Sequence, residues 1–117
     1  QQSFVCEGES GMERMSNIME QLRLAPPQKI AQFEIVKTED YEKSEIVDKK
    51  SGAVTPITLP KSNVIAFRLE NEARVVVRPS GTEPKIKVYY TTTGKNAEDA
   101  KKLTKIIQDD FTKILGF

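Results

Sequence analysis

The pattern of apolar positions predicts a helix near each end of the chain. Apolar residues recur at spacings of three and four in two stretches, which is the spacing of one helix face: Met12, Met15, Ile18, Met19 and Leu22 in the first, and Ala100, Leu103, Ile107, Phe111 and Ile114 in the second. A methionine-rich stripe can be an adaptable binding surface, but this spacing is more typical of core packing. We therefore expect both stripes to face a hydrophobic core.

The predicted ends of these helices carry recognisable stop and start residues. Ser10 to Glu13 has the spacing of a capping box, in which the serine and glutamate side chains satisfy free backbone donors. Pro26 and Pro27 cannot continue a helix, and Asn96 is suited to cap the second one. We expect the first helix to begin near residue 10 and end before residue 26.

Between the helices, alternation of apolar and polar residues predicts the first and last of four strands, and runs of β-favouring residues predict the two between them. They cover residues 30–36, with Ala31, Phe33 and Ile35 on one face, residues 63–69, residues 73–77, and a segment containing Ile86, Val88 and Tyr90. Only residues 70–72 separate the second and third strands, which is a hairpin length. Residues 37–62 are rich in charge and contain Pro56 and Pro60, so we expect them to be irregular.

This order of elements, one helix, four strands and a second helix, indicates an α+β fold. We expect a four-stranded, mainly antiparallel sheet with the helices packed on one face. A length of 117 residues is too short for two domains with separate cores, so a single domain is expected.

The composition excludes several classes of function. With 18 Lys and Arg against 17 Asp and Glu, the chain has no overall field that would attract nucleic acid or a membrane surface, so any anion site must be local. No apolar run approaches the roughly 20 residues that cross a bilayer. The single cysteine and the lack of a signal-peptide pattern indicate the cytoplasm.

The chain has few residues suited to catalysis. It contains no histidine, which is the commonest general base and metal ligand. One cysteine cannot form a zinc site with a second, and no Asp-x-Asp motif is present. We expect neither a catalytic residue nor a metal ligand in this chain.

The segment between the last two strands has the groups that bind a phosphate. Arg78 can donate to two phosphate oxygens at once, and Ser80 and Thr82 add hydroxyl donors. Gly81 can take a positive φ, which would let successive N–H groups form an anion-binding nest.

The flanking residues of this segment add rigidity and charge. Pro79 and Pro84 stiffen its two ends, and Lys85 and Lys87 lie on one strand face, where we expect at most one to reach a ligand. Proline, serine, glycine and threonine are also ordinary turn formers, so the residues alone leave a plain turn open.

The string from Arg78 to Tyr89, Arg-Pro-Ser-Gly-Thr-Glu-Pro-Lys-Ile-Lys-Val-Tyr, resembles the phosphate-binding loop of the α-D-phosphohexomutase superfamily. That loop belongs to the C-terminal, fourth domain of the family. The resemblance is strongest to the branch of phosphoglucomutases, phosphopentomutases and glucose-1,6-bisphosphate synthases. Further stretches resemble it in the same order: Glu7-Gly8, Gly11 to Glu13, Met19 to Arg23, Asp40-Tyr41 and Leu59 to Val64.

The resemblance implies a TATA-box-binding-protein-like fold and a role in a four-domain isomerase that interconverts sugar 1-phosphates and 6-phosphates. In that family a phosphoserine and a bisphosphorylated sugar carry the phosphoryl group. Mg²⁺ and glucose 1,6-bisphosphate are implied for the whole enzyme, with no cofactor bound by this chain. Residues 1–10 would be the tail of a preceding domain or a linker, and residues 11–117 the phosphate-binding domain, inactive by itself.

The resemblance also implies roles for individual residues. Arg78, Ser80, Gly81 and Thr82 would bind the phosphate that is not being transferred, followed in order of expectation by Lys87 and Lys85. Some relatives have an arginine near the end of the next strand, where this chain has Tyr89-Tyr90. The implied partners are a phosphosugar and the other three domains of the same polypeptide, without nucleic acid or membrane.

Two alternatives remain open from the sequence. The sugar specificity can be that of a phosphomannomutase or a phosphopentomutase, because the residues that choose the sugar belong to other domains. The domain can also be a non-catalytic module whose sheet binds nucleic acid or another anion through Arg74, Arg78, Lys85 and Lys87.

Overall fold

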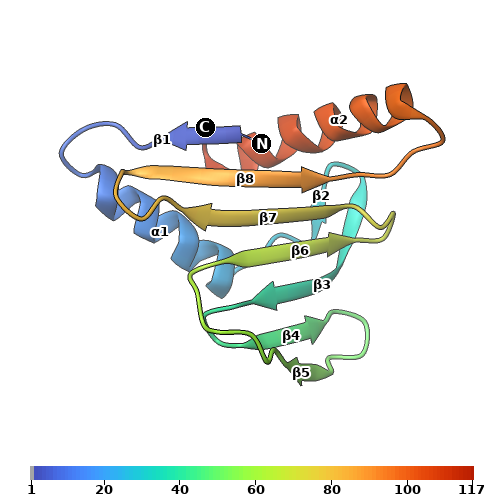
Figure 1. The fold of residues 1–117 in the computed structure, drawn as a ribbon, viewed down its shortest axis with the longest axis horizontal. Helices are drawn as coiled ribbons and strands as arrows, with labels where there is room; N and C mark the ends of the chain where they lie inside the picture. The colour runs from blue at the N-terminus through green and yellow to red at the C-terminus, as the bar shows by residue number, and fades with distance from the viewer. Residues whose placement is uncertain (1) are drawn as a thin grey trace.

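A computed structural model describes residues 2–117 and contains one antiparallel sheet with two helices on one of its faces (Figure 1). The elements are β1 (Gln2–Val5), α1 (Gly11–Leu24), β2 (Lys29–Ile30), β3 (Phe33–Asp40), β4 (Glu45–Asp48), β5 (Val54–Pro56), β6 (Ile65–Leu69), β7 (Arg74–Pro79), β8 (Lys85–Thr91) and α2 (Ala97–Leu115). The strand order is β1-β8-β7-β6-β3-β4-β5, and β2 pairs only with β3. The α+β expectation is confirmed, although the sheet has more strands than the four predicted.

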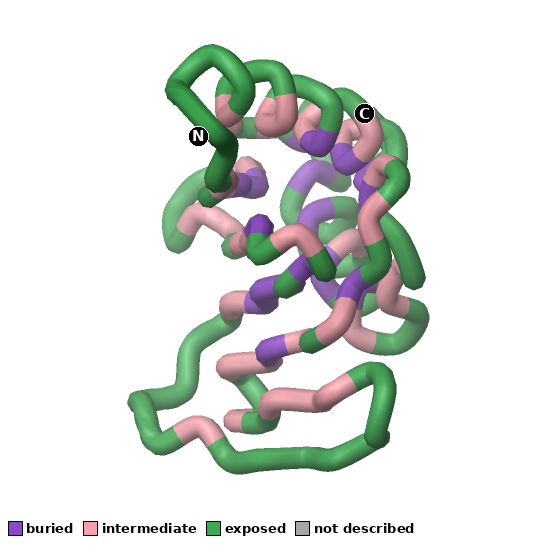
Figure 2. Tube along the Cα trace, turned by 90° about the vertical axis from the view of Figure 1, so that its right-hand side faces the viewer, coloured by how far each residue is buried: buried purple, intermediate pink, exposed green. Residues whose placement is uncertain are grey.

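The core lies between the sheet and the two helices. Figure 2 shows the buried positions gathered there, while the β4–β5 end of the sheet is mostly exposed. The helices contribute Met15, Met19 and Leu22 from α1 and Ile107, Phe111 and Leu115 from α2, and the strands contribute Ile65, Phe67, Val75, Val77, Ile86 and Val88. Most of both predicted stripes is therefore in the core. Met12 is 50% exposed and Ile114 is 36% exposed, so their predicted burial is wrong.

The two predicted helix starts differ in how they are capped. Asn96 caps α2 as expected, because its side-chain Oδ1 accepts a hydrogen bond of 2.9 Å from the Asp99 N–H. Ser10 occupies the N-cap position of α1, but its side chain makes no capping hydrogen bond. The predicted capping box is thus wrong, although the predicted position of the helix start is correct.

The predicted strand at residues 30–36 and the irregular segment after it are corrected by the structure. Residues 29–30 form the short strand β2, and the chain then turns at Ala31, whose φ is +56°, before β3 begins at Phe33. β3 continues to Asp40, and β4 and β5 follow within the segment expected to be irregular. All of β5 is exposed and β4 is at most half-buried, so hydrogen bonds to a neighbouring strand, and not a strong alternation of burial, define these two strands.

The N-terminal segment packs as part of the sheet and core. β1 pairs antiparallel with β8, from Gln2 opposite Val88 to Val5 opposite Lys85, and Cys6 is fully buried. The Phe4 ring stacks on the Phe117 ring at 4.9 Å between centroids, so the two ends of the chain lie together (Figure 1). The assignment of residues 1–10 to a preceding domain or linker stays a prediction. Residue 1 lies outside the described residues.

Candidate anion-binding loop

The loop between β7 and β8 is fixed at both ends by backbone hydrogen bonds. The Ser80 N–H donates to the Lys85 carbonyl at 2.8 Å, and the Lys85 N–H donates to the Glu83 carbonyl at 2.8 Å. From another part of the chain, the Cys6 N–H donates to the Pro84 carbonyl at 2.7 Å. The loop is therefore held by the strands on either side of it and by the segment that leads into α1.

The middle of the loop presents donors that the domain itself does not use. Within residues 2–117, neither the amides of Gly81, Thr82 and Glu83 nor the hydroxyls of Ser80 and Thr82 take part in a hydrogen bond. Gly81, Thr82 and Glu83 are exposed. These groups can therefore donate hydrogen bonds to an acceptor from outside the domain, and an oxyanion is such an acceptor.

Gly81 differs from the expectation in its backbone conformation. Its φ is not positive, so the predicted left-handed conformation is wrong. A Cβ built on Gly81 would have no atom within 4 Å, so the fold imposes no steric need for glycine either. What glycine provides here is an uncovered backbone, which a ligand can approach closely.

Two uncommitted cations lie beside the loop on the face of the sheet opposite the helices, which we call the open face. Arg78 on β7 is directly opposite Lys87 on β8. Among the described residues neither makes an ion pair, and the Arg78 guanidinium lies 5.9 Å from the centre of the Tyr89 ring. Like charges that are directly opposite in a sheet repel each other, and an anion bound between them would remove that cost.

Lys85, by contrast, is neutralised within the loop. Its Nζ lies 3.2 Å from the Glu83 Oε2. Both side chains are partly exposed, so this ion pair contributes little to stability. Its effect is to reduce the positive charge that Lys85 offers a ligand. The structure therefore brings Arg78, Lys87 and the loop donors together and leaves Lys85 paired with an acid.

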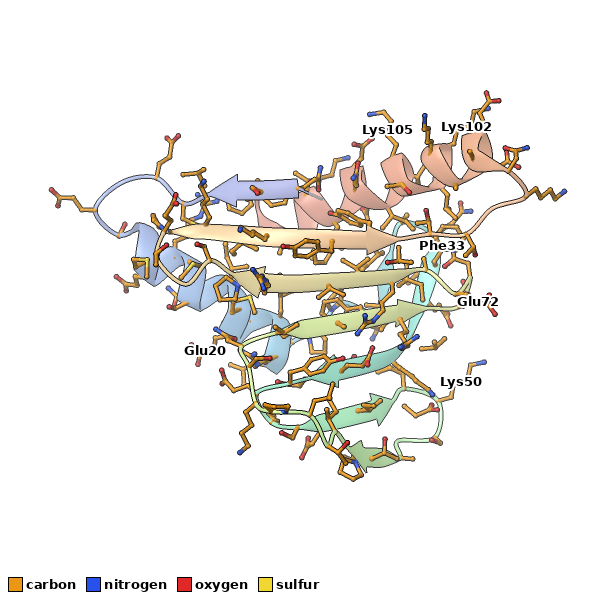
Figure 3. The ribbon with its side chains drawn as sticks, in the orientation of Figure 1. Glu20, Phe33, Lys50, Glu72, Lys102 and Lys105 are labelled. Carbon is orange, nitrogen blue, oxygen red and sulfur yellow. The ribbon has the colours of Figure 1, made fainter. Side chains whose placement is uncertain are left out.

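Arg74 also lies on the open face, but a buried carboxylate holds it. Glu39 is 5% exposed and its Oε1 accepts from the Arg74 Nε at 3.2 Å and from the Arg68 Nε at 3.0 Å. Tyr41 donates its hydroxyl to the other oxygen of Glu39 at 3.3 Å. Arg74 begins β7 at the end of the sheet away from the β7–β8 loop, next to the turn in which Figure 3 labels Glu72. Two of the four cations named for a nucleic-acid surface, Arg74 and Lys85, are thus already paired.

The described residues contain no group of three or more side chains that could hold a metal ion.

Tyr90 projects from the helix-covered face, and burial raises the pKa of its phenol well above the usual value. Its hydroxyl donates to the Gln2 Oε1 at 2.8 Å, so it joins β8 to β1 as a neutral group. Over residues 2–117, no helix has the length and apolar character needed to cross a membrane.

The sequence did not reveal the residues that support the loop. Gly11 is buried at the start of α1, where a Cβ would overlap the Cys6 carbonyl oxygen and lie 3.1 Å from the Pro84 Cβ. Gly11 therefore allows α1, Cys6 and the loop to meet. Because Cys6 and Gly11 are far from Pro84 in the sequence, no local pattern could have indicated this contact.

Comparison with known proteins gives a consistent result. Residues 19–109 match the family described as "Phosphoglucomutase/phosphomannomutase, C-terminal domain". A phosphoglucomutase of Staphylococcus saprophyticus is 39% identical over 93 residues, which are 80% of this chain and 17% of that protein. One of Staphylococcus epidermidis is 41% identical over 89 residues, or 76% of this chain and 16% of the relative.

A phosphoglucomutase of Staphylococcus aureus is 39% identical over 106 residues, which are 90% of this chain and 19% of that protein. The chain thus spans less than a fifth of the length of these curated relatives. No solved structure gave a significant match.

Proposed function

The chain belongs to the phosphoglucomutase/phosphomannomutase family through a match to its C-terminal domain, and from this membership we propose that the β7–β8 loop binds a phosphate group of a phosphosugar. In this proposal the domain works with other domains of the same polypeptide in a sugar-phosphate isomerase of the phosphoglucomutase type. Phosphomannomutase and phosphopentomutase specificity are the alternatives for the substrate.

One observation carries the proposal: Arg78 and Lys87 lie directly opposite each other without a counter-ion among the described residues, beside unused loop donors. A dianion bound there would receive a charge-assisted hydrogen bond from Arg78 and a point charge from Lys87. The Gly81 and Thr82 amides and the Ser80 and Thr82 hydroxyls would complete its coordination. Lys85 would contribute least, because Glu83 neutralises it.

This arrangement suits the phosphate that is not being transferred. A bisphosphorylated sugar that rebinds in the reverse orientation must offer either phosphate to the same site, and amides, hydroxyls and cations bind phosphate on any sugar carbon. Holding the distant phosphate converts remote binding energy into positioning of the reacting group, which is the main means of catalysis in phosphoryl transfer. The domain would be inactive alone.

The cofactors remain part of the proposal for the longer protein. Because no set of metal-binding side chains is grouped within residues 2–117, the residues present do not fit Mg²⁺, and no step in this domain passes through the metal. Glucose 1,6-bisphosphate would be the ligand whose second phosphate reaches the loop.

The test is a titration of the chain with glucose 1,6-bisphosphate, followed by the amide signals of residues 80–83 in proton–nitrogen NMR. Arg78→Met should weaken binding about 10- to 100-fold, because a hydrogen bond to a charged group contributes roughly 1.5–3 kcal/mol. Lys85→Met is the matched control. It should change affinity by less than about threefold, because Glu83 already pairs with Lys85 and a partly exposed ion pair contributes little. Unchanged loop signals at millimolar ligand, or equal effects of the two variants, would contradict the proposal.

The same titration tests the substrate alternatives at this site. Because the proposed contacts involve only the phosphate, glucose, mannose and pentose phosphates should bind the chain with similar affinity. A clear preference for one sugar would show that this domain reads the sugar as well.

A further inference from the structure

A small, partly enclosed pocket lies at the other end of α1 from the β7–β8 loop. It has a volume of about 120 Å³ and is lined by Arg23, Pro26, Thr38, Asp40, Lys43, Glu45, Val47, Lys49 and Ile65. Gly11, at the first turn of α1, contacts Pro84 of the loop, whereas Arg23 is in the last turn. At about 1.5 Å per residue, the helix separates the two places by roughly 20 Å.

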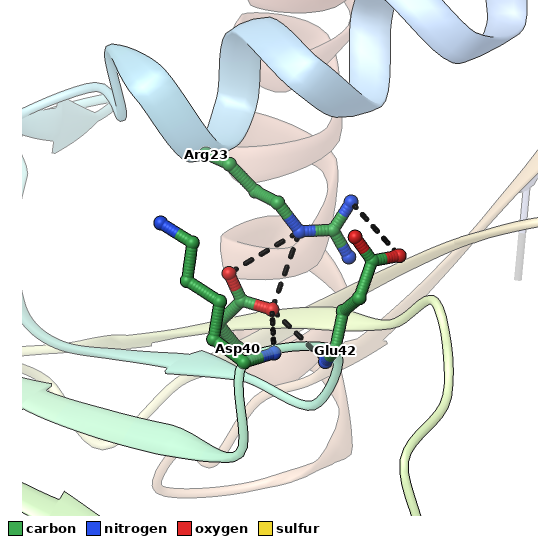
Figure 4. Close-up of polar contacts among 4 residues, drawn as sticks. Arg23, Asp40 and Glu42 are labelled. Atoms are coloured by element: carbon green, nitrogen blue, oxygen red, sulfur yellow. Dashed lines mark hydrogen bonds and ion pairs between the residues drawn. The ribbon is translucent and has the colours of Figure 1, made fainter.

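Arg23 is held in place at this pocket with one donor group unused. Its side chain is only 10% exposed, and its Nε donates to both carboxylate oxygens of Asp40 at 3.2 Å (Figure 4). Its Nη1 lies 3.8 Å from the Glu42 Oε2. The remaining nitrogen, Nη2, is buried and has no acceptor within the described part of the chain. A buried donor of this kind is costly unless it is paired.

A second unpaired donor lines the same pocket from a different element. Thr38 is on β3, directly opposite Val47 of β4, and its Oγ1 is buried with no hydrogen-bond partner among residues 2–117. Native proteins leave few buried polar atoms unpaired. Two of the three unpaired side-chain atoms found in the described residues line this one pocket.

The acids and cations around the pocket balance once Glu42, which lies 3.8 Å from Arg23, is counted, so the case for an anion rests on the two unpaired donors and not on net charge. Asp40 is already occupied, because it accepts from Arg23 and its Oδ1 also accepts from the Glu42 and Lys43 amides at 3.0 and 3.2 Å. Arg23 is therefore shared between Asp40 and Glu42. Lys43 and Lys49 line the pocket together with Glu45, and within the described chain neither lysine forms an ion pair.

We propose that this pocket binds a small oxyanion, with the Arg23 Nη2 and the Thr38 hydroxyl as its donors and Lys43 and Lys49 at its edge. A guanidinium N–H can only donate, so the ligand must present an acceptor, which excludes a metal cation. The volume of about 120 Å³ is well above the roughly 10–15 Å³ of such space that a single water needs, and it accommodates a phosphate, sulfate or carboxylate group. The bound anion joins the end of α1 to β3.

This site is independent of the proposed phosphate-binding loop. None of its lining residues belongs to the loop or to β7 and β8. Arg78→Met therefore removes the loop interaction and leaves this pocket intact, so that failure of one proposal is separable from failure of the other. The chain would then bind two anions at opposite ends of α1.

The test uses the 117-residue chain carrying Arg78→Met, titrated with inorganic phosphate at constant ionic strength. The NMR signals of the Arg23 Nε–H and the Thr38 amide report on the pocket, and the Gly81 amide reports on the loop. Phosphate should shift the first two signals with a saturable curve and raise the melting temperature. A linear drift without saturation, or shifts at Gly81 alone, would overturn the proposal and leave the pocket as a water site.

Thr38→Val is the decisive variant because it keeps the shape of the side chain. It should weaken phosphate binding at the pocket about 3- to 10-fold, the effect of one lost hydrogen bond. It should leave the stability of the phosphate-free chain unchanged or higher, since it removes an unpaired buried hydroxyl. Thr55→Val, on exposed β5, is the matched control and should change neither. Equal affinity of the Thr38→Val and Thr55→Val chains would overturn the assignment of Thr38.

Substitution of the anion identifies the chemistry of the ligand. Acetate or sulfate that competes with phosphate for the same signals supports an oxyanion site, and the strongest of the three indicates whether a phosphate or a carboxylate group is the preferred form. If chloride at the same ionic strength shifts the signals equally, the effect is general screening and the proposal fails.

Discussion

Replacing Gly11 with alanine should reveal the link between α1 and the β7–β8 loop. A Cβ at this position would overlap the Cys6 carbonyl oxygen and lie 3.1 Å from the Pro84 Cβ. The overlapping atom belongs to the backbone, so relief requires movement of the segment around Cys6. Because the Cys6 N–H also donates to the Pro84 carbonyl, that movement shifts one end of the loop.

The expected cost follows from two opposing effects. Forcing an extra carbon into a packed site costs typically about 1–3 kcal/mol, while alanine recovers up to about 1 kcal/mol of helix propensity relative to glycine. A net loss of roughly 1–2 kcal/mol should lower the melting temperature by about 4–8 °C in a domain of this size. Glucose 1,6-bisphosphate should also bind more weakly, by about 3- to 10-fold for a displaced donor.

Two other glycines provide matched controls. Gly52 has a φ of +74° and no atom within 4 Å of a built Cβ, so Gly52→Ala should cost about 1 kcal/mol through backbone strain alone. Gly81 has neither a positive φ nor a close neighbour, so Gly81→Ala should change stability by less than about 0.5 kcal/mol. Gly81→Ala should nevertheless weaken binding, because its methyl group covers the loop amides.

Thermal unfolding and the bisphosphate titration together separate these effects. We expect Gly11→Ala to reduce both stability and binding, Gly52→Ala to reduce only stability, and Gly81→Ala to reduce only binding. The reasoning is refuted if Gly11→Ala unfolds and binds as the parent chain does. It is also refuted if Gly52→Ala weakens binding as much as Gly11→Ala, since global destabilisation would then explain the result.

Three further substitutions test the packing and electrostatics. Phe111→Ala should cost about 3–5 kcal/mol in urea unfolding, because the ring is fully buried between Phe67 and Tyr90, with centroid distances of 6.2 and 6.4 Å; a loss below about 1 kcal/mol would contradict this packing. Asn96→Ala should cost about 1 kcal/mol by removing the cap of α2, and an unchanged urea midpoint would count against the cap. Hydrogen bonds from the Ser51 and Lys50 amides lower the pKa of Asp48 below 3.8, so its contribution is complete at higher pH and is lost as the pH falls below 3.8; Asp48→Asn should flatten urea-midpoint curves over this acid range, and an unchanged pH dependence would refute the assignment.

Several features of the fold could be predicted from local patterns. The stripe from Met15 to Leu22 and the one from Leu103 to Phe111 indicated helices, because a helix that packs against a sheet must repeat its apolar residues every three or four positions. The hairpin of β6 and β7 was equally clear, because both strands are rich in residues that favour strands and a short turn separates them. The chemical character of the loop followed from its residue types, since arginine and hydroxyls next to glycine are donors in any conformation.

Other features depended on contacts between distant parts of the chain. β5 is exposed throughout and β4 is at most half-buried, so both depend on hydrogen bonds that a neighbouring strand supplies. The pairing of Lys85 with Glu83, and the ordinary φ of Gly81, were decided by how the loop closes. Residue types could not indicate either of these details.

The sequence by itself therefore determined the α+β class, the two helices, the central strands and the location of the candidate anion-binding loop. The periodicity of burial and the chemistry of side chains are properties of short segments, which each segment carries without its neighbours. Only the tertiary structure placed Arg78 opposite Lys87, brought Cys6 and Gly11 against Pro84, and enclosed Arg23 with Thr38. Register, packing and burial are relations between segments that are distant in the chain, and they exist only once the sheet and helices have assembled.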